Sequence, residues 1–133
     1  MVLKREELAK SVVDDYQAKD RSNGKATDEG LSGVYETYAT LFMERFDKTK
    51  DNRSLDAAFG AFGKAIGFDP QDVTAYKNRG NAYRRKGDWD RAIADYDKSI
   101  SLEPNDALSY GNRGYAYSNK SDWDRAMLIT IRP

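Results

Sequence analysis

An internal repeat of 34 residues is the feature that most restricts how this chain can fold. The run from Arg79 to Tyr83 returns in closely similar form at 113–117, and the run from Asp88 to Ala92 returns unchanged at 122–126. Extended backwards, the same spacing aligns Ala92 with Ala58, Tyr96 with Phe62 and Pro104 with Pro70. A period of this length indicates stacked supersecondary units, each burying a face against its neighbours, rather than one closed globule.

The best-formed unit spans 72–105 and predicts two helices joined by a tight turn. Asp72 suits the N-cap of the first helix, and Gly87 can adopt the left-handed conformation that closes it. Asp88 then caps a second helix over 89–102, which Pro104 prevents from continuing. Two helices per repeat with short turns predict a helical hairpin whose open faces are covered by the next hairpin.

The remaining segments also show helical spacing. We expect a helix over 4–18, an exposed loop over 19–28, and a helix over 31–48. A further helix, with Ser54 at its N-cap, should end before Pro70. The apolar stripe of the helix over 31–48 is formed by Val34, Tyr38, Leu41, Phe42 and Phe46.

The unit resembles the tetratricopeptide repeat, whose pattern is W-x2-L-G-x2-Y, then A-x3-F, then P. In this chain the pattern reads Tyr76-x2-Arg79-Gly80-x2-Tyr83, then Ala92-x3-Tyr96, then Pro104. A second copy reads Tyr110-x2-Arg113-Gly114-x2-Tyr117, then Ala126. The resemblance implies an all-α fold: a right-handed α-solenoid of tetratricopeptide-type helical hairpins with an extra N-terminal helix.

On this basis the chain divides into four parts. Residues 1–30 hold the N-terminal helix and exposed loop, 31–71 a degenerate repeat, 72–105 a tetratricopeptide repeat, and 106–133 a second, incomplete one. The second copy departs from the first in two ways. Ser121 replaces Gly87, and residues 127–133 abandon the polar template for an apolar one. We expect a helix that begins at Trp123 after a turn capped by Asp122.

Arginine stands at the leucine position of the family pattern in both copies, as Arg79 and Arg113. The packing at that position must therefore accommodate a long polar side chain whose charged end reaches outward.

The amino-acid composition argues against a catalytic or metal-binding role for this chain. It has no cysteine and no histidine, which excludes disulfides and removes the commonest general base and metal ligand. The pairs Asp88/Asp90 and Asp122/Asp124 recur at the repeat period, as helix caps should. We therefore expect no enzyme, no catalytic residue, no cofactor and no metal site.

Charge and hydropathy limit the partners and the location. Lys and Arg total 22, as do Asp and Glu, so no overall basic field attracts nucleic acid. An RNA-binding role for the basic cluster Arg79, Arg84, Arg85 and Lys86 is not favoured, because no aromatic residues interleave with it. No apolar run approaches the ~20 residues of a membrane span. Without the apolar core of a secretory signal at its start, the chain is expected to be cytoplasmic.

The resemblance also implies a binding surface on the concave face, lined by the first helix of each hairpin. Mapped onto this chain, the candidate protein-binding residues are Thr74, Lys77, Asn81, Arg84, Asn112, Tyr115 and Asn119. Lys77, Asn81 and Asn112 also match family members that clamp the C-terminal carboxylate of a chaperone, although the repeat that completes that clamp is missing. Tyr115 is either an interface anchor or a residue that packs on the end of the stack.

Two functions follow from these observations. The first is a protein-protein interaction module that binds a peptide or helix on the concave face. The alternative is a structural or assembly protein that forms a homo-oligomer through residues 123–131, with Leu128 and Ile131 at the contact. Apolar residues in that segment have no following helix of the repeat to cover them, and uncovered apolar patches often mark contacts.

Overall fold

The computed structural model describes residues 7, 10–11, 14 and 28–131, and all elements of this part are helices. They are α2 (Asp28–Thr49), α3 (Asn52–Phe68), α4 (Val73–Lys86), α5 (Trp89–Leu102) and α6 (Ala107–Ile131). Most of the predicted N-terminal helix and its loop lie outside the described residues, and positions 7, 10, 11 and 14 are helical. The prediction of an all-helical chain is confirmed for the part described.

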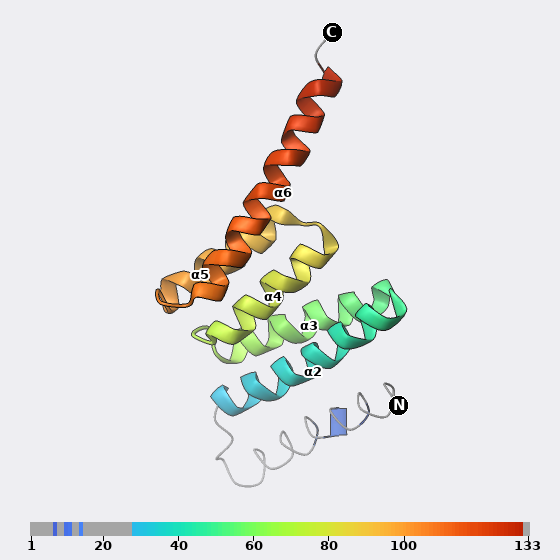
Figure 1. Ribbon diagram of the computed structural model, residues 1–133. Coiled ribbons are helices and arrows are strands. Elements are labelled where there is room, and N and C mark those ends of the chain that lie inside the picture. The colour runs from blue at the N-terminus through green and yellow to red at the C-terminus, as the bar shows by residue number, and fades with distance from the viewer. Residues whose placement is uncertain (1–6, 8–9, 12–13, 15–27, 132–133) are drawn as a thin grey trace.

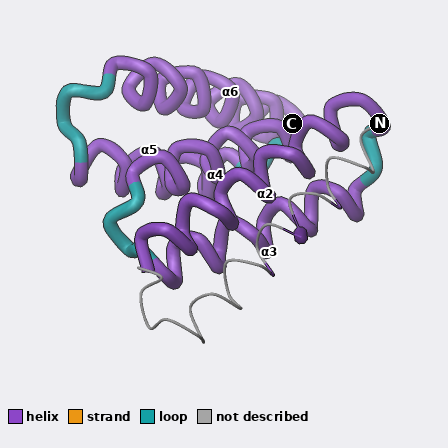
Figure 2. Tube along the Cα trace, turned by 90° about the horizontal axis from the view of Figure 1, so that it is seen from below, coloured by secondary structure: helices purple, strands orange, loops and turns teal. Residues whose placement is uncertain are grey.

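The helices form two successive hairpins followed by a long single helix (Figures 1 and 2). In the chain order, α2 packs on α3, α4 packs on α5, and α6 packs on α5. The first helices of successive units also meet, because α4 contacts both α2 and α6. This arrangement makes α4 the central element, with one neighbouring unit on each side.

Small residues let the paired helices approach closely. The buried core between α2, α3 and α4 contains four alanines, among them Ala58 and Ala82, around Met43, Leu55 and Phe62. In the second hairpin, a Cβ atom on Gly80 would lie 2.8 Å from Cε1 of the Tyr96 ring, far inside normal contact. The glycine of the repeat pattern is therefore required for α4 and α5 to pack at this distance.

The most deeply buried face of α2 differs from the predicted stripe. The five apolar residues of that stripe are half-buried, and all of them except Leu41 pack at the edge of the core. The buried apolar positions follow a spacing of four residues, namely Leu31, Tyr35, Ala39 and Met43. Close packing of two helices favours a small side chain such as Ala39 at the centre, so the largest apolar residues lie beside it.

In the best-formed repeat, the predicted helix-capping residues have the predicted roles. Asp72 accepts a hydrogen bond from the amide of Ala75, and Asp88 accepts one from the amide of Arg91. Gly87 has a φ of 83°, as predicted for the residue that ends α4. The prediction that Ser54 caps α3 is wrong.

Asp51 caps α3 instead, accepting from the amide of Arg53 at 3.0 Å. Ser54 is buried inside the helix. Both residue types are good caps, so the residue that faces solvent at the start of the helix takes the role.

The predicted turn in the second copy is absent. α6 runs without a break through Ser121 and Asp122, over 25 residues, and extends away from the stack in Figure 1. Asp122 is therefore an exposed residue within a helix rather than an N-cap, and Trp123 does not begin a new helix. A non-glycine residue in the left-handed conformation costs ~1–2 kcal/mol, which disfavours at Ser121 the turn that Gly87 makes.

Arginine at the leucine position is accommodated by an ion pair in each copy. Arg79 binds Asp95 through two hydrogen bonds of 2.8 Å, and the Asp95 side chain is only 7% exposed. Arg113 donates instead to Asp97 of α5, also at 2.8 Å. The residue 34 positions after Asp95 is Ile129, so the second arginine has no carboxylate at the equivalent place.

We predict that Asp95→Ala destabilises the protein by about 2 kcal/mol, because it leaves the half-buried Arg79 guanidinium unpaired. Asp97→Ala is the matched control, since its pair with Arg113 is more exposed and such pairs are worth ~0–1 kcal/mol. Urea unfolding followed by circular dichroism measures both. Equal losses for the two variants would contradict the structural role assigned to the Arg79–Asp95 pair.

Candidate functional site

A groove of about 160 Å³ lies between α2 and α4, the first helices of consecutive units. Its floor includes the buried side chains of Met43 and Phe62. Polar residues of both helices form its walls, namely Thr40, Glu44 and Asp47 from α2 and Asn78, Asn81 and Arg85 from α4. The groove thus combines an apolar floor with polar walls, which is typical of a site for a small part of a ligand.

Polar contacts across the groove hold α2 and α4 together. Arg85 donates to a carboxylate oxygen of Asp47, and Asn78 donates through Nδ2 to Oε1 of Glu36 at 3.1 Å. Burial raises the pKa of the Glu36 carboxyl above its usual value, and the hydrogen bond from Asn78 opposes that rise. These contacts fix the width of the groove from both sides.

Asn81 is the residue at which three helices meet. Its Oδ1 accepts from the Tyr96 hydroxyl of α5 at 2.6 Å and from Nδ2 of Asn112 in α6 at 3.2 Å. No described residue accepts from Nδ2 of Asn81, which belongs to the lining of the groove. The side chain is therefore held in place by its oxygen, while its amide hydrogens have no acceptor among the described residues.

Lys77 lies on the same helix but is already paired. Its Nζ donates to Oδ2 of Asp106 at 2.7 Å, and the same oxygen accepts from the Ser109 hydroxyl. The hydrogen bond from Lys77 is the main reason that the pKa of Asp106 lies below its ordinary value. Lys77 thus fastens α4 to the start of α6.

Arg84 and Tyr115 form a separate cluster beside Trp89. The Arg84 guanidinium lies 5.5 Å from the centroid of the Tyr115 ring, and that ring meets Trp89 edge-on at 6.4 Å. Tyr115 is nevertheless 54% exposed. Asn119 donates to the Tyr115 carbonyl within α6. The Tyr115 ring is thus both packed on the stack and available at its surface.

The structure brings the predicted site residues together in part. Asn81 meets Asn112, and Arg84 meets Tyr115. Thr74 is exposed on the first turn of α4 and does not line the groove. Lys77 faces Asp106 rather than open space.

The groove also has a wall that the sequence reasoning missed. Thr40, Met43, Glu44 and Asp47 stand 34 residues before Thr74, Lys77, Asn78 and Asn81. Extending the 34-residue period back through the degenerate unit would have identified these α2 residues.

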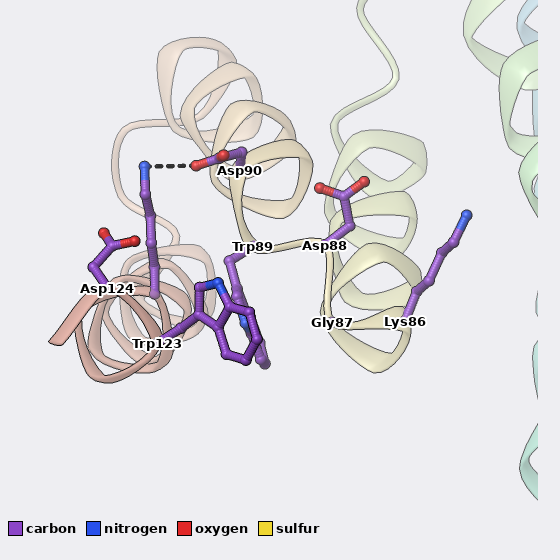
Figure 3. Close-up of a pocket in the computed structure, with 8 residues that line it drawn as sticks. Lys86, Gly87, Asp88, Trp89, Asp90, Trp123 and Asp124 are labelled. Carbon is purple, nitrogen blue, oxygen red and sulfur yellow. Dashed lines mark ion pairs between the residues drawn. The ribbon is translucent and has the colours of Figure 1, made fainter. Parts of the chain in front are cut away.

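A second, more open hollow of about 470 Å³ lies where the turn of the second copy was expected (Figure 3). It lies between the start of α5 and the middle of α6, with Trp89 and Trp123 among its lining residues. Lys120 pairs with Asp90 at 2.6 Å across it. Trp123 is 63% exposed, so the hollow leaves a large apolar side chain uncovered by the described residues.

None of the described helices has the length and apolar character required to cross a bilayer. In the same part of the chain, no group of three or more carboxylates is placed to hold a metal ion.

Comparison with known proteins supports the repeat assignment. Two family models described as tetratricopeptide repeat match residues 73–106 and 95–127. No match was found among curated proteins. The structure of the Arabidopsis OM64 TPR domain is similar to this chain with a TM-score of 0.59 and 22% identity, over 85% of this chain and 84% of that one.

A structure of MamA is also similar, with a TM-score of 0.64 and 22% identity, over 90% of this chain. The match spans 63% of the MamA chain. At this identity the likeness concerns the fold, and both structures support a helical-repeat solenoid.

We predict that Lys77→Met raises the pKa of Asp106 towards its ordinary value of 3.8, because the variant removes the main donor to that carboxylate. A carboxylate with a lowered pKa stabilises the fold above its unfolded pKa, and that stability is lost as the pH falls through the folded pKa. NMR titration of the side-chain carboxyl carbons measures the change. Asp51, whose pKa is lowered by Arg53, serves as the internal control and should not move.

Proposed function

We propose, from the chain's membership of the tetratricopeptide repeat family, that it binds an extended peptide segment in the groove between α2 and α4. Repeats of this family form protein-protein interaction modules, and this chain is one by its repeats and fold. The observation that supports the groove as the site is that two pairs of equivalent positions from consecutive units, Glu44 with Asn78 and Asp47 with Asn81, line it around an apolar floor. A binding role, rather than catalysis, fits this arrangement.

The dimensions and donors of the groove indicate the chemistry of the ligand. A volume of about 160 Å³ matches one apolar side chain rather than a cofactor. Met43 and Phe62 provide the apolar contact, and Nδ2 of Asn81 can donate to a peptide carbonyl of the ligand. We therefore propose a ligand that inserts one apolar side chain, aliphatic or phenyl, and is held along its backbone.

The pairing of Lys77 disfavours recognition of a free C-terminus. A carboxylate clamp needs cationic groups that face the ligand, and Lys77 is already neutralised by Asp106. The ligand segment is therefore internal to its own chain. The polar and aromatic residues Asn112, Tyr115 and Asn119 extend the proposed surface onto α6, and a cytoplasmic location stays a prediction.

We predict that Thr40→Trp weakens binding at least tenfold, because the indole would occupy the groove. The probes are peptides selected on the wild-type protein from a random 12-residue phage library, with affinities measured by fluorescence anisotropy. Thr37→Trp is the matched control: Thr37 and Thr40 make the same hydroxyl-to-carbonyl bond at 3.0 Å within α2, and both are exposed. Of the two, only Thr40 lines the groove.

Equal affinities for both threonine variants would place the selected peptides elsewhere on the molecule. A library that yields no peptide binding the wild type more tightly than ~100 µM would also contradict the proposal, since weaker binding is below what a recognition groove needs.

We predict further that the same peptides bind equally well, within about twofold, with a free or an amidated C-terminus. Lys77 stays engaged with Asp106, so a terminal carboxylate gains no new partner. If amidation weakened the affinity tenfold or more, and Lys77→Met abolished this difference, the protein would instead clamp a C-terminal carboxylate.

A further inference from the structure

We propose that the hollow between the start of α5 and the middle of α6 binds an arginine side chain of a partner protein against the indoles of Trp89 and Trp123. The hollow shares no lining residue with the groove between α2 and α4. The two sites are therefore separate, and binding at one can be tested without binding at the other.

The hollow exists because α6 continues where the first hairpin turns. The five residues that begin with Asp88 are repeated unchanged from Asp122, so each copy has a tryptophan at the same place. In the first copy Trp89 begins α5 after the turn at Gly87. In the second copy Trp123 stays within α6. Two equivalent tryptophans consequently line one hollow from two different helices.

The position of Trp123 on α6 places it on the side of the helix that faces α5. Ala116 of that side is fully buried against α5, and Lys120, one turn later, pairs with Asp90 in the first turn of α5. Trp123 follows Lys120 by three residues and so continues this side. It is nevertheless 63% exposed, because the hollow lies in front of it. An uncovered aromatic ring of this kind marks a contact site.

Trp89 supplies a second ring, which is held in a fixed orientation. It packs on the buried cluster around Tyr96 and meets the Tyr115 ring edge-on at 6.4 Å. A ring that is already held by such contacts loses little conformational freedom when a ligand binds.

The charges around the two rings favour a cation. Three carboxylates and two ammonium groups line the hollow, from Asp88, Asp90, Asp124, Lys86 and Lys120. Lys86 extends away from both indoles, and its Nζ lies 5.6 Å from the centroid of the Phe59 ring (Figure 3). Lys120 is paired with Asp90 at 2.6 Å. Both ammonium groups are thus engaged, while the carboxylates exceed them by one.

Asp124 is the carboxylate that remains for a ligand. Asp88 is engaged as the N-cap of α5 and pairs with Arg91 at 3.4 Å. No hydrogen bond or ion pair joins Asp124 to another residue that the structure describes. Its charge does act on Lys120, whose pKa is raised chiefly by the hydrogen bond to Asp90 and to a smaller degree by Asp124.

Arginine fits these features better than other side chains. Its guanidinium is planar and weakly hydrated and stacks on aromatic rings, among which indole gives the strongest cation–π attraction. The N–H groups at its edge can donate to the carboxylate of Asp124. The hollow measures about 470 Å³ against about 160 Å³ for the groove between α2 and α4, so it has room for the side chain and the backbone that carries it.

The protein contains its own reporter for a binding test. Its two tryptophans both line the hollow, so intrinsic fluorescence reports on this site. The probe is the peptide Gly-Arg-Gly-Arg-Gly with both ends capped, and the control probe has citrulline in place of arginine, which keeps the shape and removes the charge. In ~150 mM salt we expect the arginine peptide to change the emission with a dissociation constant below ~1 mM. The citrulline peptide should bind at least about fivefold more weakly.

An aromatic pair of variants locates the contact. Trp123→Leu should weaken binding of a dye-labelled arginine peptide at least about fivefold, measured by fluorescence anisotropy. Because Trp123 is exposed, the variant should keep its helical content, which circular dichroism verifies. Tyr110→Leu is the matched control, since Tyr110 is also an exposed aromatic residue of α6 but does not line the hollow.

A pair of aspartate variants tests the charge. Asp124→Asn should weaken binding at least about threefold. Asp122→Asn makes the same change at an exposed residue of α6 outside the hollow and should leave the affinity unchanged.

Four results would overturn the assignment. Equal affinities for the arginine and citrulline peptides would show that charge is not recognised. Equal effects within the aromatic pair or within the aspartate pair of variants would place the peptide elsewhere on the molecule. The third is the absence of binding at ~1 mM arginine peptide. The fourth is tighter binding of a single-stranded oligonucleotide, which would make the hollow a site for stacked bases instead.

Discussion

The contact between Gly80 and Tyr96 is the constraint on which the rest of the structure depends. The absence of a side chain at Gly80 lets α4 and α5 approach until the Tyr96 ring is fully buried between them. That approach brings the Tyr96 hydroxyl to Asn81, and Asn81 in turn reaches Asn112 of α6. One glycine therefore sets the distance within a hairpin and the position of the next unit.

The contact between Gly80 and Tyr96 also determines which polar groups face the groove between α2 and α4. The oxygen of Asn81 is engaged on the side of α5 and α6, so its amide is held on the side of α2. The wall opposite comes from the residues one repeat earlier, and the Asp47–Arg85 pair joins the two walls. The proposed recognition surface is thus a consequence of stacking, since neither hairpin alone contains both sides of it.

Prediction from the sequence succeeded where the determining interactions are local. Asp72, Gly87 and Asp88 act within one turn of chain, and the structure has all three in the predicted roles. Ser54 and the stripe of α2 were misjudged because solvent exposure and helix approach decide between chemically similar residues. The α2 wall of the groove was missed because its residues no longer match the sequence pattern of the repeat. They do keep the 34-residue spacing.

The straight course of α6 shows why a repeat in sequence does not guarantee a repeat in structure. A hairpin turn requires a residue that tolerates positive φ, and the gain must come from the covering helix that follows. In the first copy Gly87 meets the first condition and Tyr96 the second, through its burial against Gly80. In the second copy Ser121 and Thr130 stand at those two positions. The turn therefore costs more free energy, and the covering contact within one chain contributes less stabilisation.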